Sequence, residues 1–238
     1  LFFLAFIFII NLIENKKIEK KIFELLIIIF SLIISIKSFY IFYSVLFLVI
    51  YFRFFKITES FKIFSLFPVT YLCLTIMFLM IISNLAASGC LLYPVSFTCF
   101  ESFFWGYGKD QVVGAMQWYE IWSKAGATPI FRVDNVEEYI SNLNWLSGWL
   151  DRYFFNKMSD YLLGLVSLSI IFYYVFYSKK INYQKKENLN LLYFTLVLLF
   201  LEWFYNHPSL RYGGYYIIAI LIFIPLSAKL SNFENHGK

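Results

Sequence analysis

The sequence predicts an all-α protein that crosses a membrane about seven times and carries a large helical loop on the extracytoplasmic side. Of its 238 residues, 61% are hydrophobic and only 15% are charged, and the mean hydropathy is +0.68. Soluble domains are roughly 45–50% apolar and about 25% charged. Apolar runs recur along the chain with short lysine-rich segments between them. These observations exclude an ordinary soluble domain.

The predicted membrane spans follow from the apolar runs, since a helix needs about 20 residues to cross the hydrocarbon core. The first run lacks a basic n-region and a small-residue cleavage site, so it is not expected to be a signal peptide. The chain begins with Leu inside this run, and we expect it to be an internal or C-terminal part of a longer protein. The predicted spans are residues 1–13 (truncated), 22–36, 39–52, 68–84, 160–177, 189–205 and 215–228.

Residues 22–52 allow two interpretations. They form either one very long helix, with an uncounted re-entrant segment elsewhere, or two helices that meet at the sequence SIKS, residues 35–38. The flanking segments 14–21 and 53–62 are both basic, and the positive-inside rule places both of them in the cytoplasm. Two crossings are then needed between these segments, so the hairpin is favoured.

With this topology, the basic segment 178–188 and the tail after residue 229 also face the cytoplasm. Residues 85–159 and the loop 206–214 fall together on the outer side, which in a bacterium is the periplasm or cell exterior. We therefore predict three parts: transmembrane residues 1–84, an extracytoplasmic Trp-rich loop 85–159, and C-terminal transmembrane residues 160–238. The net charge of +5 reflects basic loops between apolar runs, and no nucleic-acid partner is predicted.

The long outer loop contains two predicted amphipathic helices. The first covers residues 111–124 and pairs Glu120 with Lys124 at the i,i+4 spacing. The second covers residues 135–156, with Asp134 as its N-cap and Glu137 at position N3. The Trp residues here either lie in the lipid headgroup layer or stack on sugar rings, and the two interpretations are compatible. They are Trp105, Trp118, Trp122, Trp145 and Trp149.

Two of the three cysteines lie in the outer loop. Cys90 and Cys99 are nine residues apart, and on an oxidising face such a pair favours a disulfide. The outer loop contains no His, so no metal site is predicted there. Cys73 falls within a predicted span, where a cysteine packs as a small hydrophobic side chain.

The sequence LEWFYNHPSLRYGGYY, residues 201–216, places charged side chains between two apolar runs. Pro208 ends the preceding helix. Charged groups at membrane depth are costly and often mark functional sites, which points to Glu202 and His207. Arg211 is suited to bind phosphate through its guanidinium fork. The alternative is that Arg211 only extends to the membrane interface and that headgroups satisfy the other two.

Three motifs together resemble bacterial multi-spanning envelope-glycan proteins of the class C glycosyltransferase and O-antigen-polymerase-like type. They are SGCLLYP at residues 88–94, WSK at 122–124, and PSLRY at 208–212. The resemblance covers about residues 68–228. Relatives often have Asp-Pro between the Pro and the Arg, whereas this chain has Ser209 and Leu210. An acidic catalytic role at that point is therefore unsupported.

This resemblance implies transfer of a sugar or glycan from a polyprenyl-phosphate-linked donor in the cytoplasmic membrane, at its outer face and among membrane lipids. No cofactor is implied. A phosphate leaving group needs fixed positive charge, which Arg211 would supply. His207 and Glu202 would complete the catalytic set, and together with Tyr93 they would either orient acceptor hydroxyls or serve as acid–base groups. The implied substrate-binding residues are Ser88, Gly89, Tyr93, Trp122 and Tyr212, and Arg132, a cation in the outer loop, is a weaker candidate for the same role.

A lipid or solute transporter is the main alternative function, and a non-catalytic membrane scaffold is another. Transporters often contain internal repeats and interrupted helices near the membrane midplane. The sequence has no convincing repeat, and its polar residues gather at one mouth of the predicted bundle. These features favour the enzyme.

Overall fold

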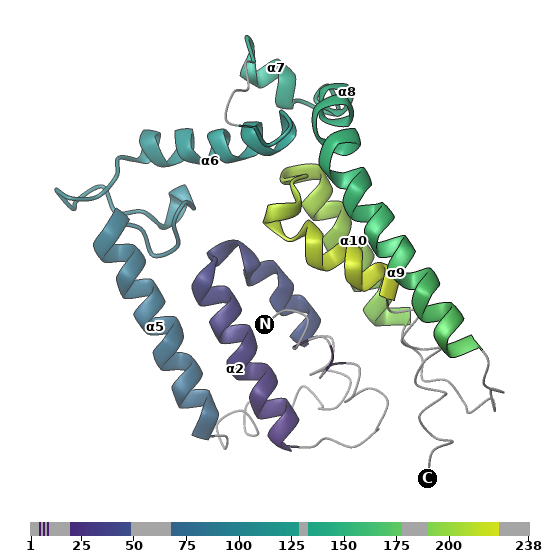
Figure 1. Ribbon diagram of the computed structural model, residues 1–238. Coiled ribbons are helices and arrows are strands. Elements are labelled where there is room, and N and C mark those ends of the chain that lie inside the picture. The colour runs from purple at the N-terminus through teal and green to yellow at the C-terminus, as the bar shows by residue number, and fades with distance from the viewer. Residues whose placement is uncertain are drawn as a thin grey trace. The chain divides into compact units, whose positions relative to one another are not determined.

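The computed structural model describes residues 20–48, 68–128, 133–177 and 190–223, together with Ala5, Ile7 and Ile9. Within these ranges the chain is helical, and the only extended pairing is a single antiparallel bridge between Cys90 and Cys99 (Figure 1). The predicted all-α class is therefore confirmed for the described residues.

The chain forms two compact units, Leu1–Trp118 and Tyr119–Lys238. The boundary between them falls within helix α6 (Lys109–Lys124). Each unit is described separately below.

The first unit contains α2 (Lys20–Ile36) and α5 (Pro68–Ser88), which pack against each other. Their buried contact includes Phe23, Ile27 and Cys73, so Cys73 is a core residue as predicted. At Lys37 the backbone is extended (φ −146°, ψ 113°), and a 3-10 turn follows at Ser38–Tyr43. The helix therefore breaks within the predicted SIKS segment, in favour of two helices instead of one (Figure 1).

Among the described residues, two helical segments are long and apolar enough to cross a membrane: α5 and the run Leu146–Val175. Two further apolar helices, α10 (Asn190–Asn206) and Gly214–Phe223, are shorter. The predicted spans 68–84, 160–177, 189–205 and 215–228 overlap these four segments. Most of the predicted span 1–13 lies outside the described residues.

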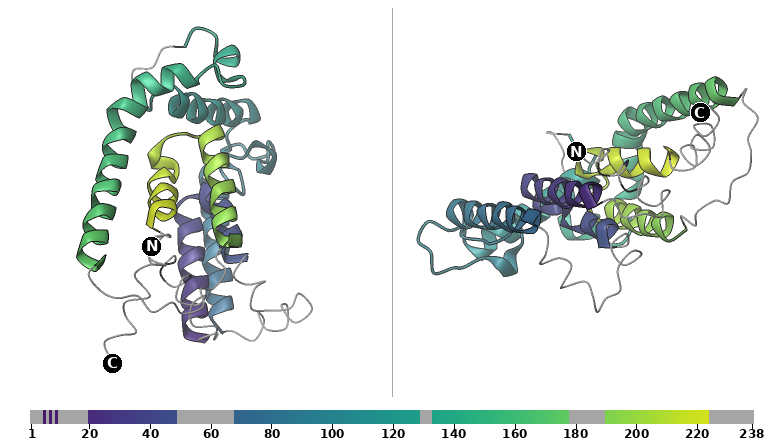
Figure 2. Two further views of the ribbon diagram at one scale, coloured as in Figure 1. Left: turned by 90° about the vertical axis from the view of Figure 1, so that its right-hand side faces the viewer. Right: turned by 90° about the horizontal axis from the view of Figure 1, so that it is seen from below.

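The second unit is dominated by one unbroken helical run. It comprises α8 (Leu146–Trp149), a π-helical segment Leu150–Met158, and α9 (Ser159–Tyr177), which continue directly into one another (Figure 2). The predicted helix 135–156 is wrong as a single element. The helix α7 (Val136–Ile140) ends at Ser141, where the backbone becomes extended, and the long run begins five residues later.

The N-cap of α7 also differs from the prediction. Asn135 is the cap, because its side-chain oxygen accepts a hydrogen bond from the backbone N–H of Glu138. Asp134 lies one position earlier and is not the capping residue. Asn and Asp are about equally good N-caps, so the position of the first helical turn decides between them.

After α10, the chain passes through the loop 207–213 and enters the last described helix, Gly214–Phe223. The loop contains a short 3-10 turn at Leu210–Tyr212, and Gly213 takes up a left-handed backbone conformation with φ 109°. Glycine adopts this conformation without the steric cost that a Cβ brings. The loop thereby returns the chain into a second apolar helix.

Candidate functional site

The loop 207–213 is fixed by two buried indole side chains. Trp149 Nε1 donates a hydrogen bond to the carbonyl oxygen of Pro208 at 2.7 Å. Trp203 Nε1 donates to the carbonyl oxygen of Ser209 at 2.9 Å. Both indoles are almost fully buried. Two consecutive backbone carbonyls of the loop therefore have partners, as buried backbone groups require.

Tyr153 holds the next peptide group of the loop. Its hydroxyl oxygen accepts a hydrogen bond from the backbone N–H of Leu210 at 2.7 Å and lies 3.4 Å from Ser209 Oγ. Since a phenol is both donor and acceptor, one hydroxyl can satisfy both groups. Together with the two indoles, Tyr153 fixes the backbone from Pro208 to Leu210.

The residue that follows this anchored segment is Arg211, whose side chain is exposed, whereas Leu210 is buried. Tyr212 is half-buried. Burial raises the pKa of the Tyr212 phenol, the nearby Tyr119 raises it further, and the Arg211 guanidinium opposes both effects. The loop therefore presents a guanidinium to solvent beside a neutral phenol.

Tyr212 lies at the centre of an aromatic cluster. Its ring centroid is 5.3 Å from the His207 ring, 5.9 Å from Trp122 and 6.5 Å from Tyr119. Trp122 and Tyr119 come from the last two turns of α6. The contacts with Trp122 and Tyr119 are edge-to-face, the arrangement that aromatic rings favour. The structure thus brings the end of α6, and the predicted residue Trp122, to the Arg211 loop.

Beside this cluster lies an ion pair between Glu120 and Lys124. Lys124 Nζ is 2.5 Å from Glu120 Oε1, and the lysine side chain is 1% exposed while that of the glutamate is 31% exposed. The ammonium lies 5.4 Å from the Trp145 ring centroid and 5.2 Å from that of Tyr205. A buried charge needs such partners, because desolvation of an isolated ammonium is very costly.

The ion pair acts electrostatically on His207. Burial lowers the pKa of the imidazole from its ordinary value of 6.5; the Glu120 carboxylate raises it and the Lys124 ammonium lowers it. The net direction is downward, so His207 is neutral at neutral pH. A neutral imidazole can accept a proton or a hydrogen bond at one of its nitrogens.

Glu202, the third predicted catalytic residue, is half-buried on the last part of α10. Its carboxylate accepts a hydrogen bond of 3.1 Å from Asn206 Nδ2, one turn later in the same helix. The carboxylate that acts on His207 is Glu120. The sequence marked Glu120 and Lys124 only as a helical pair, and their position beside Trp122 was the signal that could have placed them at the site.

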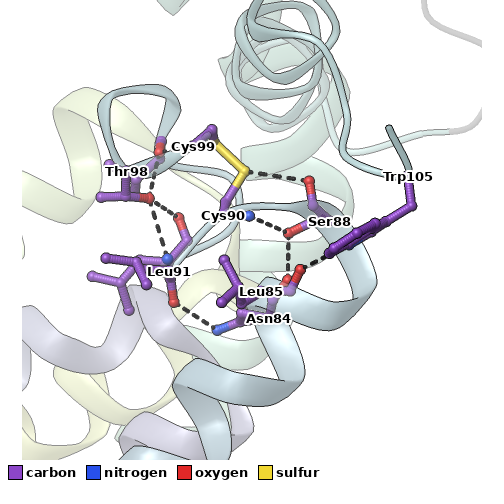
Figure 3. Close-up of a disulfide and its surroundings, with 10 residues drawn as sticks. Asn84, Leu85, Ser88, Cys90, Leu91, Thr98, Cys99 and Trp105 are labelled. Carbon is purple, nitrogen blue, oxygen red and sulfur yellow. Dashed lines mark hydrogen bonds between the residues drawn. A yellow bond between two sulfur atoms is a disulfide. The ribbon is translucent and has the colours of Figure 1, made fainter. Parts of the chain in front are cut away.

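Ser88 and Gly89 have local structural contacts at the end of α5. Ser88 Oγ donates to the carbonyl oxygen of Asn84 at 2.7 Å and accepts from the backbone N–H of Cys90 at 3.3 Å (Figure 3). Gly89 has a left-handed backbone with φ 74°, and a Cβ there would lie 2.8 Å from the Cα of Gly106. A larger residue at position 89 would separate the two backbone segments.

The structure contains a disulfide between Cys90 and Cys99, with an S–S distance of 2.08 Å (Figure 3). Tyr93 lies within the nine-residue span that it closes, half-buried, with its ring centroid 5.8 Å from that of Tyr107. These residues belong to the first unit, whereas Arg211, His207, Glu202, Trp122 and Tyr212 belong to the second. Arg132 lies outside the described residues.

Within the described ranges, no three His, Cys, Asp or Glu side chains come close enough to hold a metal ion. The chemistry available in the second unit is that of a guanidinium, a neutral imidazole and aromatic faces. The first unit contributes the disulfide-closed loop at the end of α5.

No curated protein and no solved structure shows significant similarity to this chain. One family model matches residues 1–218, and its description is "Domain of unknown function (DUF8201)". Because the match covers most of the sequence, the chain belongs to the DUF8201 family.

Proposed function

We propose that this protein is an integral membrane glycosyltransferase or polysaccharide-polymerase-like enzyme. It acts on polyprenyl-phosphate-linked sugars at the outer face of the bacterial cytoplasmic membrane. The observation that supports this function best is the anchored loop: Pro208, Ser209 and Leu210 are fixed by buried side chains, and Arg211 directly follows them with its guanidinium exposed.

The membrane part of the proposal comprises about seven spans. It is supported by the apolar surface that the described helices leave uncovered, since soluble proteins rarely expose large contiguous apolar patches. On α9, the exposed side chains include Leu163, Val166, Leu168, Ile170, Ile171 and Phe172. We infer that lipid covers such surfaces.

Arg211 would bind the phosphate or diphosphate of the lipid-linked donor. A guanidinium stays charged at all relevant pH values and forms paired hydrogen bonds with phosphate oxygens. Negative charge grows on the leaving phosphate as the bond to the sugar breaks, so a fixed positive charge stabilises the transition state more than the ground state. Fixing the backbone before Arg211 limits the reorganisation that this charge needs during the reaction.

His207 would accept the proton of the acceptor hydroxyl as that oxygen attacks the sugar. Its lowered pKa supports this role, because the imidazole must be neutral to act as a base. Trp122 and Tyr212 would offer apolar ring faces to the sugar. Glu202 would orient an acceptor hydroxyl.

The resemblance of the motifs also gives substrate-binding roles to Tyr93, Ser88 and Gly89, and Arg132 is a further candidate as a cation of the outer loop. For Ser88 and Gly89, the local contacts at the end of α5 support an indirect role, in which they shape the loop that carries Tyr93. Arg132 would add a second cation for the donor.

The test replaces Arg211 with Lys in the full-length gene, which keeps the charge and removes the guanidinium fork. The expected result is loss of the glycan product by at least about tenfold, measured as lipid-linked and polymerised glycan in cells, since Arg and Lys are not equivalent at a bidentate phosphate site. Arg152→Lys is the matched control, because Arg152 is also exposed in the second unit.

Equal abundance of the variants in the membrane must be verified by immunoblotting. Wild-type glycan levels in the Arg211→Lys strain would contradict the proposed role of Arg211. Equal loss in both variants would show a general need for arginine on this surface and would also contradict a specific phosphate contact.

A further inference from the structure

An exposed aromatic surface lies directly after α5, on residues 97–107, which we call the aromatic loop. Phe97 is 86% exposed and Phe104 is 95% exposed. Phe100, Trp105 and Tyr107 each expose between 44% and 48% of their surface. Five exposed aromatic side chains within eleven residues are unusual for a surface in water, because each leaves a large apolar area in contact with solvent.

Trp105 ties this loop to the last turn of α5. Its Nε1 donates a hydrogen bond of 3.4 Å to the carbonyl oxygen of Leu85, which also accepts the backbone N–H of Gly89 at 2.9 Å (Figure 3). The Phe103 ring stacks on the indole at a centroid distance of 4.6 Å, and the Phe104 ring meets it edge-on at 5.0 Å. The aromatic side chains are therefore placed at one end of α5.

The backbone of the aromatic loop is hydrogen-bonded to the end of α5 at two positions, Phe100 and Tyr107. The N–H of Phe100 donates to the carbonyl oxygen of Gly89 at 2.9 Å, and that of Tyr107 donates to Ser88 at 2.9 Å. The disulfide joins Cys99, within the loop, to Cys90, which lies just after the end of α5. These contacts fix the loop against the helix end, so its aromatic side chains are displayed and not folded inward.

The composition and length of α5 indicate what covers the exposed aromatic surface of the loop. The 21 residues of the helix contain no charged side chain, and at 1.5 Å per residue they span about 30 Å, the thickness of a bilayer's hydrocarbon core. The exposed apolar residues along it are Tyr71, Leu72, Leu74, Phe78, Leu79 and Ile82. If α5 crosses a membrane, its C-terminal end lies at the headgroup level, where Trp and Tyr are enriched.

We propose that the aromatic loop inserts into the boundary between headgroups and acyl chains of the phospholipid leaflet at the C-terminal end of α5. Phe97 and Phe104 enter the upper acyl region, and Trp105 lies beside them with its N–H already bonded to Leu85. Lipid is favoured over a soluble partner because the exposed aromatic rings directly follow the uncharged helix α5, and the acidic side chain among them, Glu101, is exposed and can stay at the level of the headgroups. The inference depends on α5 crossing the membrane and is independent of the proposed enzymatic activity.

The test measures the fluorescence of Trp105 in lipid. The full chain is reconstituted into vesicles of phosphatidylcholine and phosphatidylglycerol, in which the phosphatidylcholine is brominated either near the carbonyl end or near the methyl end of its acyl chains. The signal of Trp105 is the difference in tryptophan emission between the wild type and the Trp105→Phe variant. We expect it to be quenched more by the shallow bromines than by the deep ones, and to be protected from iodide in the water.

A second reporter probes the same loop without relying on the emission of Trp105. Phe104→Trp in the Trp105→Phe background should show the same preference for shallow bromines. Phe78→Trp in that background, near the middle of α5, should prefer the deep bromines. If Phe78→Trp is not quenched, α5 does not cross the membrane and the inference is overturned.

Three other outcomes overturn the inference even if α5 crosses. Quenching of Trp105 by iodide and by neither lipid would place the loop in water. Protection from all three quenchers would show that protein covers it. Stronger quenching by the deep bromines would place it within the hydrocarbon. None of these results depends on glycan synthesis, so they are distinct from failure of the Arg211→Lys test.

Discussion

The indole N–H of Trp149 donates a hydrogen bond of 2.7 Å to the carbonyl oxygen of Pro208, 59 residues later in the chain. Trp149 is 2% exposed, so no water can easily replace it as the donor. The bond connects the start of the long helical run to the loop that carries Arg211. The position of the exposed guanidinium thus depends on a buried side chain in another segment.

Trp149→Phe should lower the stability of the second unit, because the Pro208 carbonyl loses its donor and the smaller ring leaves a cavity. An unsatisfied buried polar group costs about 1–3 kcal/mol. The measurement is the thermal midpoint of the purified protein in detergent. Trp118→Phe is the control, because that side chain is 50% exposed. A midpoint for Trp149→Phe equal to that of the control would contradict the role of the hydrogen bond.

Gly214→Ala should disturb the same loop from the other side. A Cβ at position 214 would overlap the Trp203 ring, which cannot move freely because its N–H is bonded to Ser209. Overpacking of this kind costs about 1–3 kcal/mol. Gly164→Ala is the matched control, since a Cβ there meets nothing within 4 Å, and Ala is favoured over Gly in a helix by about 0.5–1 kcal/mol.

Thermal midpoints of the two glycine variants should therefore move in opposite directions. The Gly214→Ala variant should also lose glycan synthesis in cells if the loop positions Arg211. A Gly214→Ala protein as stable as the wild type would show that Trp203 can shift without cost.

The helices were predictable where local pattern determines them. The apolar run after Pro68 predicts α5, because an uncharged segment of this length is expected to cross a membrane, where a helix satisfies its backbone groups internally. The break at Lys37 falls within the SIKS segment that the charge argument had selected. The prediction of a single helix over residues 135–156 was wrong because the turn at Ser141, where α7 ends, has no Gly or Pro to mark it.

The site was only partly predictable, because burial depends on segments far apart in the sequence. Arg211 and His207 stand out as polar residues between apolar runs. Lys124 resembles an ordinary exposed helical lysine until the fold places Trp145 and Tyr205 around its ammonium. Helical periodicity cannot report that contact, since both rings come from other elements.

Glu120→Gln should destabilise the protein more than Lys124→Met. The first change leaves a fully buried ammonium without its counter-ion, whereas the second leaves a carboxylate that is 31% exposed and partly solvated. Breaking a buried ion pair from one side costs about 3–5 kcal/mol, and the exposure of Glu120 reduces the second penalty. Thermal midpoints of both variants test this order.

The double variant Glu120→Gln with Lys124→Met provides the control for that pair. It should recover much of the stability lost in Glu120→Gln, because no unpaired buried charge remains. Additive losses in the double variant would show that the two side chains do not interact.

The disulfide predicts how the outer-loop cysteines react. Cys90 and Cys99 should resist alkylation under denaturing conditions until a reductant is added, whereas Cys73 should be labelled in the unfolded chain without it. Mass spectrometry of peptides from membranes prepared with a thiol-blocking reagent gives the measurement. Labelling of all three cysteines before reduction would exclude the disulfide in the cell.

His207 should make the protein less stable in mild acid. Burial lowers the pKa of its imidazole below the ordinary value of 6.5, which the unfolded chain retains. Between these two pKa values the unfolded state binds more protons than the folded state, so stability rises with pH. The contribution of His207 is therefore fully present above about pH 6.5 and is lost as the pH falls through the folded-state pKa.

The measurement compares thermal midpoints of the wild type and His207→Gln from neutral to mildly acidic pH. Gln is polar and cannot be protonated in this range, so its midpoint should fall less below about pH 6.5. The same acid range should reduce glycan synthesis in the wild type, because a protonated imidazole cannot accept the proton of an acceptor hydroxyl. Parallel stability curves for the two proteins would show that His207 titrates as it does in water, and would remove the basis for its role as a neutral base.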